Sequence, residues 1–254
     1  MFRYGLKLFS TNANYVAEAV RLYKENIYDY IELYTEPNSY KKFIQLWKNL
    51  EIPYVIHAPH FRNGLNLAKA GHAENNIVLL KETQAFADAL SAETIIVHPG
   101  IAGDIHETSR QLNNINDCRI IIENKPYYAL NDDLVCNGSS PEEIKKIIEE
   151  TGSGFCFDIG HAIYSANAIK VDPWKYINMF LDLKPKMFHL TDGDFNSVYD
   201  KHDHFGKGSF DLKKIISYIP SKTIITLEIE KKYKDNLKDF EQDVLYLKRL
   251  AKII

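Results

Sequence analysis

The stretch KMFHLTDGDFNSVYDKHDHFGKG, residues 186–208, joins a short apolar run to the densest group of ionisable side chains in the sequence. The apolar run ends in His189, and the loop behind it carries Asp200 and His202 into a glycine-lysine-glycine turn. Imidazole and carboxylate side chains crowded at the end of a strand are typical ligands of divalent zinc or manganese. The stretch therefore predicts a buried strand whose carboxyl end contributes to a metal site.

On both sides of this stretch, short β-rich runs alternate with amphipathic helical segments along the whole length. Helical spacing is clear in residues 40–50, where Phe43, Leu46, Trp47 and Leu50 form one apolar face. The predicted strands are residues 4–9, 30–33, 54–58, 94–97, 119–122, 154–157, 186–190 and 223–227. The predicted helices are residues 15–24, 40–50, 73–90, 107–112, one that opens with the proline at 141, 173–183, 211–219 and 237–250.

This strict alternation predicts an α/β protein, a closed parallel (β/α)8 TIM barrel that forms one domain over residues 1–254. Eight units with short connections imply parallel strands joined by right-handed crossovers, and about 250 residues is the usual size of such a barrel. The active site of a TIM barrel is built on the loops after the strands. The residue at the carboxyl end of each strand is therefore the informative one.

Ionisable side chains stand at most of these strand ends. Because side chains alternate along a strand, four of them share a face with an inward apolar or small residue: His98 with Ile96, Glu123 with Ile121, Asp158 with Cys156, and Glu228 with Thr226. The other ligand-type residues near strand ends are His57, His60, His161, His189, Asp192, Asp200, His202 and Glu230. So many carboxylates and imidazoles would force like charges together unless a cation bound among them. The pattern predicts a divalent-metal site.

Composition narrows the class of protein. The net charge of −3 and the 45% hydrophobic content allow a sizeable core and give no overall basic field that would attract nucleic acid or an anionic membrane. Cys118, Cys136 and Cys156 are an odd set without CxxC spacing, which fits a reducing compartment. No run of about 18 apolar residues and no signal-peptide pattern is present. We therefore expect a cytoplasmic protein with no membrane partner, and a homo-oligomer is compatible with the sequence.

Seven motifs in chain order make the sequence resemble the xylose isomerase-like TIM-barrel superfamily. They are HAPHFRNGLNL (57–67), VHPG (97–100), IIENKP (121–126), FDIGHA (157–162), FHLTDGD (188–194), DKHDHFGKG (200–208) and TLEIE (226–230). The superfamily contains sugar and sugar-phosphate isomerases and epimerases. One of its branches is the endonuclease IV family of abasic-site nucleases, also called AP endonuclease family 2.

The resemblance implies which residues hold metal. The shared metal core would be Glu123, Asp158, His189 and Glu228. In the nuclease branch, further zinc ions are held by residues that match His60, His98, His161, Asp200 and His202, and all five are ligand-type here. The implied cofactor is one to three Zn²⁺ or Mn²⁺ ions per chain, and the histidine-rich set favours zinc.

Three functions fit such a site. A metal-dependent isomerase or epimerase of carbohydrate metabolism would bind a sugar or sugar phosphate, with Glu123 and Glu228 exchanging a proton at a metal-stabilised enediolate. His57, His161 and Lys207 would then bind substrate oxygens. A zinc-dependent endonuclease IV-like enzyme would instead hydrolyse a phosphodiester of abasic-site DNA. The third function is non-catalytic binding of a metal or a sugar by the barrel.

The sequence favours the isomerase or epimerase over the nuclease. The nucleases carry a bulky Tyr-Leu pair that enters the DNA, whereas this chain has Asn63-Gly64 at that place. Without a wedge, the few kcal/mol of unstacking are harder to supply. Lys207 stands where the family usually has glutamate and suits an anionic substrate. Under either reaction, Glu123→Gln and Glu228→Gln are expected to abolish activity without loss of the fold.

Overall fold

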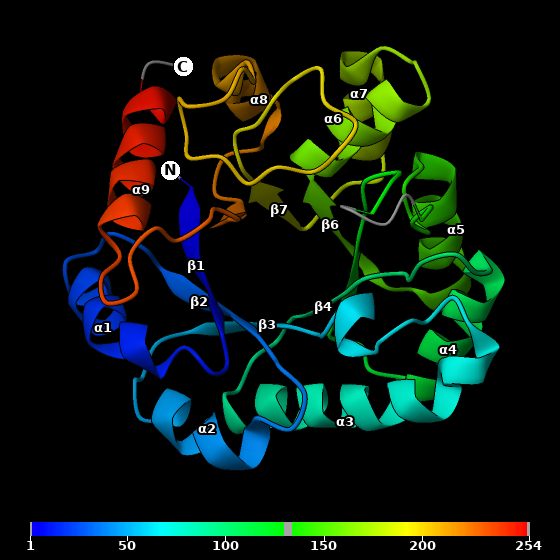
Figure 1. The fold of residues 1–254 in the computed structure, drawn as a ribbon, viewed down its shortest axis with the longest axis horizontal. Coiled ribbons are helices and arrows are strands. Elements are labelled where there is room, and N and C mark those ends of the chain that lie inside the picture. Colours follow the sequence, from blue (N-terminus) through cyan, green and yellow to red (C-terminus); the bar gives the residue numbers. More distant parts are fainter. Residues whose placement is uncertain (1, 130–133, 253–254) are drawn as a thin grey trace.

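Eight parallel strands close into a barrel in chain order in the computed structural model, which describes residues 2–129 and 134–252 (Figure 1). Each strand pairs in parallel with the next, and the last strand pairs with the first. The strands are β1 (Arg3–Phe9), β2 (Tyr30–Tyr34), β3 (Tyr54–His57), β4 (Ile95–Val97), β5 (Ile120–Glu123), β6 (Gly154–Asp158), β7 (Met187–Leu190) and β8 (Ile224–Leu227). The predicted TIM barrel is confirmed.

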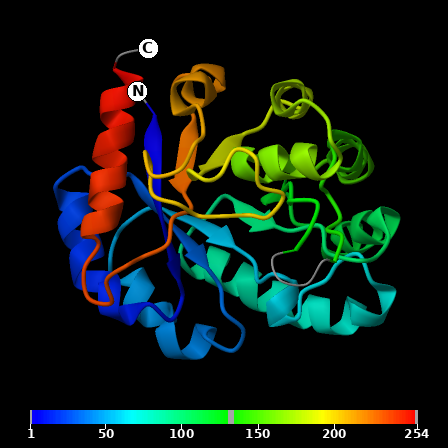
Figure 2. The same ribbon diagram turned by 45° about the horizontal axis from the view of Figure 1, so that its top comes forward.

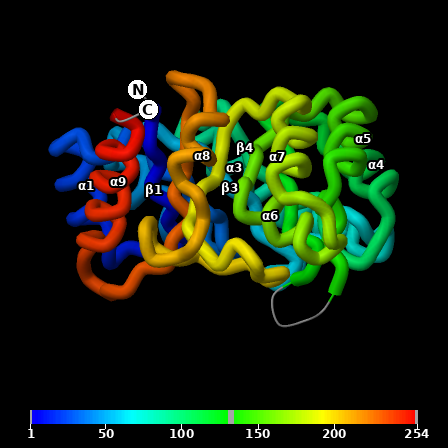
Figure 3. The backbone as a smooth tube through the Cα atoms, turned by 90° about the horizontal axis from the view of Figure 1, so that it is seen from above, coloured from blue at the N-terminus to red at the C-terminus, as the bar shows by residue number. Residues whose placement is uncertain are grey.

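Helices surround the barrel on its outside (Figure 2). Within the described residues they are α1 (Val16–Lys24), α2 (Tyr40–Lys48), α3 (Ala73–Ala89), α4 (Ile105–Ile115), α5 (Pro141–Thr151), α6 (Ile159–Ala168), α7 (Pro173–Leu181), α8 (Leu212–Tyr218) and α9 (Lys238–Ala251). Short 3-10 turns cover Ala13–Tyr15, Phe61–Asn63 and Ala70–His72. The last helix, α9, lies beside α1 and β1 (Figures 1 and 3), where Arg21 and Glu241 form an ion pair of 3.2 Å. None of the helices described is both long and apolar enough to traverse a bilayer.

Helix α6 corrects the prediction of eight helices in strict alternation, because two helices follow β6. All residues from Ile159 to Ala166 are buried. A helix buried on every side has no polar face, so its sequence lacks the amphipathic period that marks a helix. The carboxylate of Asp158 caps α6 by accepting a hydrogen bond of 2.7 Å from the backbone N–H of His161. This cap fixes two of the predicted site residues within one helical turn.

The core has an inner layer inside the barrel and an outer layer between the strands and helices. Tyr30, Val55, Ile96, Ile121, Cys156 and Met187 form the inner cluster. The hydroxyl group of Tyr30 hydrogen bonds that of Thr226 across 2.8 Å. The predicted inward direction of Ile96, Ile121 and Cys156 is therefore confirmed. His98, Glu123 and Asp158 each follow one of these three residues by two positions. Their side chains therefore point to the same side, above the apolar inner cluster and nearer the carboxyl end of the barrel.

Candidate metal centre

A cavity of about 280 Å³ opens at the carboxyl ends of the strands. Most of the predicted site residues line it: His57, His60, His98, Glu123, His161, Asp200, His202 and Glu228. Asp158 and His189 are not part of the lining, and their side chains are buried in the barrel. The fold thus brings residues from loops that are far apart in sequence to one place, as the reading of strand ends predicted.

Four of these residues form a compact core, which consists of Glu123, Asp158, His189 and Glu228. One possible ligand atom from each lies within 4.8 Å of the others. Nδ1 of His189 is 2.7 Å from Oε1 of Glu228 and 3.5 Å from Oε2 of Glu123. Nδ1 of His189 and Oε1 of Glu123 are buried and lack a hydrogen bond of good geometry. Unsatisfied polar atoms are costly in a protein interior, and a divalent cation would satisfy both. The residues therefore fit the metal that the sequence predicted.

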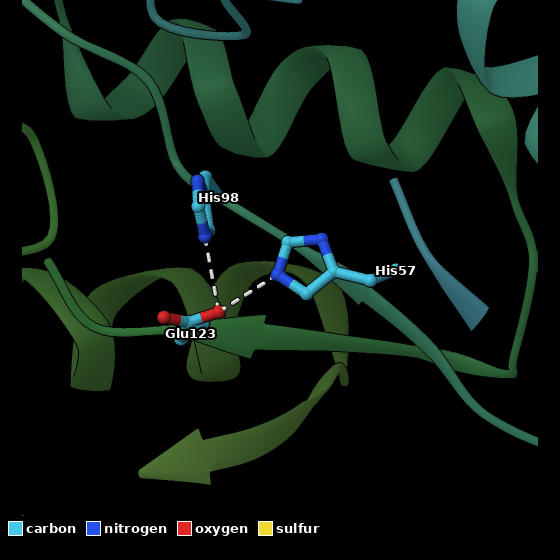
Figure 4. Close-up of side chains that lie close together, drawn as sticks. All are labelled: His57, His98 and Glu123. Carbon is cyan, nitrogen blue, oxygen red and sulfur yellow. Dashed lines mark hydrogen bonds and ion pairs between the residues drawn. The ribbon is translucent and has the colours of Figure 1, made fainter. Parts of the chain in front are cut away.

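Two histidines converge on the second oxygen of Glu123 (Figure 4). Nε2 of His57 lies 3.1 Å and Nε2 of His98 lies 3.0 Å from Oε2 of Glu123. Nδ1 of His57 is 2.7 Å from the carbonyl oxygen of Ala58, to which its N–H donates. This bond directs Nε2 of His57 towards Glu123. His57, His98 and Glu123 form a second group with metal-ligand spacing.

A third group surrounds Asp200, which also lines the cavity. Its Oδ2 is 3.3 Å from Nε2 of His161 and 2.9 Å from Nε2 of His202. Each histidine is held from behind, because Nδ1 of His161 lies 2.8 Å from the carbonyl of Asn124 and Nδ1 of His202 lies 2.7 Å from that of Glu228. Nδ1 of His161 is also 3.3 Å from Oε1 of Glu123. Glu123 consequently has contacts to all three groups.

His60 and Lys207 occupy more peripheral positions. The ring of His60 stacks on that of His98 with 6.3 Å between ring centroids, and its Nδ1 accepts a hydrogen bond from the backbone of Arg62. Lys207 is exposed and lines a different cavity, together with His204 and Asp243. The structure thus places His60 at the edge of the site and does not bring Lys207 to it.

Asp192 and His204, two other ionisable residues of the stretch 186–208, make contacts that hold the loop in its conformation. The carboxylate of Asp192 accepts hydrogen bonds from the backbone N–H groups of Gly193, Gly206, Gly208 and Phe210. A side chain at Gly208 would meet Oδ1 of Asp192 at 2.4 Å, so the turn wraps tightly around this carboxylate. His204 pairs with Asp243 across 2.6 Å. This turn therefore holds the loop that carries Asp200 and His202.

Three charged residues that contact predicted site residues are missing from the prediction. Lys7 on β1 makes an ion pair of 3.2 Å with Glu32 on β2 and contacts Glu228. Glu32 accepts a hydrogen bond of 2.8 Å from Nε2 of His189 across the barrel. Lys125 lies 3.5 Å from Nε2 of His161 and lines the cavity. Lys7 and Glu32 each interrupt an apolar strand, and a charged residue inside such a strand is the signal that could have identified them.

Burial and neighbouring charges act against each other on these groups. Burial raises the pKa of Glu123, but His98, His189 and Lys125 outweigh it and bring that pKa well below 4.5. Burial lowers the pKa of His202, but Asp200 and Glu228 outweigh it and raise that pKa to about 10. Burial and the charge of Lys125 lower the pKa of His60 to about 3. Burial also lowers the pKa of His189, but neighbouring carboxylates outweigh it and raise that pKa, whereas burial lowers the pKa of His98 well below 6.5. In the metal-free protein, His189 and His202 therefore form ion pairs with carboxylates, while His60 and His98 are neutral.

The raised pKa of His202 predicts how the stability of metal-free protein depends on pH. A histidine whose pKa is higher in the folded state stabilises the fold fully below its unfolded value of 6.5, and this contribution is lost as the pH rises to about 10. We expect the melting temperature of chelator-treated protein to fall over this window, and to fall less steeply in His202→Gln. Thermal unfolding followed by circular dichroism measures both slopes. Identical slopes in the two proteins would show that His202 does not carry this charge.

Comparison with known proteins relates most of the barrel to one family. The family described as xylose isomerase-like TIM barrel matches residues 17–250. Uncharacterized protein MJ1311 of Methanocaldococcus jannaschii is 24% identical over 72% of this chain and 65% of its own length. A probable endonuclease 4 of Mycobacterium tuberculosis is 27% identical over 68% of this chain and 70% of that protein. The crystal structure of a D-tagatose 3-epimerase-like protein superposes with a TM-score of 0.74 at 20% identity, covering 99% of this chain and 97% of that one.

Proposed function

We infer the function of this protein from one premise: the chain belongs to the xylose isomerase-like TIM barrel family. We propose that it is a divalent-metal-dependent phosphodiester hydrolase whose centre holds more than one ion. The observation that carries this proposal is the position of Glu123. Its Oε2 faces Nε2 of His57 and of His98, and Glu123 also belongs to the core group with Asp158, His189 and Glu228. A carboxylate with ligand groups on both sides suits a bridge between ions.

The three groups suggest which residues would hold each ion. Glu123, Asp158, His189 and Glu228 would hold the core ion, and His98 with Glu123 and the pair of His161 and Asp200 would hold the others. Bound zinc ions would supply Lewis acidity and a nucleophilic water at neutral pH. The similarity to a probable endonuclease 4 supports abasic-site DNA as the first substrate to test.

Residues that line the cavity without belonging to the three groups are suited to bind substrate. Lys125 and Arg62 place positive charge at the cavity, where they can bind the oxygens of a phosphate. Phe9, Tyr34 and Phe61 line the same cavity and offer apolar faces to a sugar or base. The chain's contribution to the reaction is thus to hold the phosphodiester against the metal ligands.

Lys125→Met tests this assignment. Loss of a charge-assisted hydrogen bond costs about 1.5–3 kcal/mol, so we expect kcat/KM for phosphodiester cleavage to fall by about 10- to 100-fold. Zinc content is expected to be unchanged, because Lys125 is not a ligand. Lys145→Met on the exposed surface of α5 is the matched control and should retain full activity. A Lys125→Met enzyme with kcat/KM within twofold of wild type would refute the role of Lys125.

The cavity itself favours a second candidate, a metal-dependent isomerase or epimerase acting on a sugar or sugar phosphate. Its volume of about 280 Å³ lies at the small end of the range for ligand pockets. The 3-10 turn of residues 61–63 ends in Gly64, so Asn63 and Gly64 stand where a bulky pair would be needed to hold a DNA helix open. Glu123 and Glu228 both line the cavity, and in this reaction they would take and return the substrate proton.

One pair of assays separates the two candidates. Zinc-loaded protein is incubated with a duplex oligonucleotide containing one abasic site, and in parallel with ketoses and their phosphates in D2O. The hydrolase predicts strand cleavage at the abasic site and no deuterium in the sugars. Deuterium incorporation next to the carbonyl group, without DNA cleavage, would contradict the hydrolase and support the isomerase. Glu228→Gln protein purified in the same way controls for contaminating nucleases.

A further inference from the structure

His189 is held differently from the other histidines of the site. His57, His161 and His202 each place Nδ1 within 2.7–2.8 Å of a backbone carbonyl oxygen, which leaves Nε2 to face the carboxylates. His189 has the opposite orientation, since its Nε2 points to Glu32 and its Nδ1 points to Glu228. His57 ends β3, His161 lies in the first turn of α6 and His202 lies in a loop, and each has a backbone carbonyl within reach. His189 lies within β7, whose backbone pairs with β6 and β8, so a side chain has to provide the partner.

Glu32 is placed to be that partner. It stands in β2, which β1 and β8 separate from β7 around the barrel, and its side chain is fully buried. Oε2 of Glu32 is 2.8 Å from Nε2 of His189. Its neighbour in strand register is Lys7, whose Nζ lies 3.2 Å from Oε1 of Glu32. Lys7 therefore balances the charge of Glu32 and holds its carboxylate against the histidine.

We propose that Glu32 is a positioning residue that accepts the Nε2 hydrogen of His189 and thereby directs the lone pair of Nδ1 into the core group. A carboxylate accepts hydrogen bonds, so the hydrogen of the ring stays on Nε2. Nδ1 is then the atom available to a metal, and it is the atom that lacks a hydrogen bond of good geometry. Carboxylate partners of this kind orient ligating histidines and strengthen them as ligands. The inference rests on the proposed metal site but not on the reaction catalysed there.

The first test measures zinc affinity. Glu32→Gln keeps the shape of the side chain, but its amide can also donate, so it no longer enforces the hydrogen on Nε2. We expect zinc bound at the core site to be held about 10- to 100-fold more weakly in competition with a chromophoric chelator. Glu93→Gln, exposed just before β4, is the matched control and should bind zinc like wild type. A Glu32→Gln protein that folds and binds zinc within twofold of wild type would overturn the proposal.

The second test needs no variant and so remains decisive if Glu32→Gln does not fold. Nitrogen-15 NMR of histidine-labelled, zinc-loaded wild-type protein reports the state of each ring nitrogen. We expect His189 to retain a hydrogen on Nε2 and to bind zinc through Nδ1. Zinc bound through Nε2 would refute the role of Glu32. If the protein binds no zinc, both the proposed metal site and this inference are wrong. If it binds zinc with the expected ring state but does not hydrolyse the substrate, only the proposed reaction is wrong.

Discussion

Glu123→Gln is expected to lower kcat/KM for phosphodiester cleavage by on the order of 10³-fold or more, the loss seen when a central catalytic group is removed. The neutral amide cannot bridge two cations, and it has to face His57 and His98 with a group that is no longer an anion. We therefore expect zinc content to fall together with activity. The fold should persist, because glutamine fills the same volume above the apolar inner cluster of the barrel.

The comparison for Glu123→Gln is the exposed substitution Glu93→Gln, which changes the same chemical groups at the opposite end of the barrel. Turnover, zinc content and the circular dichroism spectrum are measured for both variants and for wild type. A folded Glu123→Gln protein with near wild-type turnover would refute the whole site assignment, under the hydrolase and the isomerase alike.

Removal of metal is expected to destabilise the protein strongly. A ligand present at about a thousandfold above its dissociation constant stabilises the folded state by about 4 kcal/mol. For a chain of this size, that corresponds to a melting temperature about 10 °C lower after treatment with a chelator. The structural reason is the core, where Glu123, Asp158 and Glu228 bring three carboxylates close together.

Calorimetry of chelator-treated protein, followed by titration with zinc, measures this effect. Zinc should restore the melting temperature of wild type but not that of Glu123→Gln. A change below about 1 °C in wild type would show that no tightly bound metal contributes to the fold.

The sequence was sufficient to predict the barrel and the histidines of the cavity lining together with Glu123, Asp200 and Glu228, because both depend on patterns local to each strand. Glu123 and Asp158 could be placed by counting along β5 and β6, since alternation fixes the direction of a side chain once the strand is known. Helix α6 was missed for the complementary reason. It is buried all round, and burial removes the amphipathic period on which helix prediction depends.

Contacts across the barrel could not be predicted in the same way. Glu32 and His189 are separated by 157 residues, and their hydrogen bond depends on the closure of the barrel through the pairing of β8 with β1. Asp192 and Lys207 show the converse limit. Both belong to the richest stretch of the sequence, yet Asp192 binds backbone N–H groups of its own loop and Lys207 is exposed away from the cavity. Residue type alone does not separate a ligand from a residue that holds the ligand's loop.

The proposal that the site binds more than one metal ion is tested most directly by measuring the number of metal ions per chain. Protein purified without chelators is analysed by elemental mass spectrometry, and metal is expressed per chain. The three groups around Glu123, His98 and Asp200 predict two or three equivalents of zinc that survive gel filtration. One equivalent or none would contradict a multinuclear centre and leave the outer histidines as substrate-binding groups.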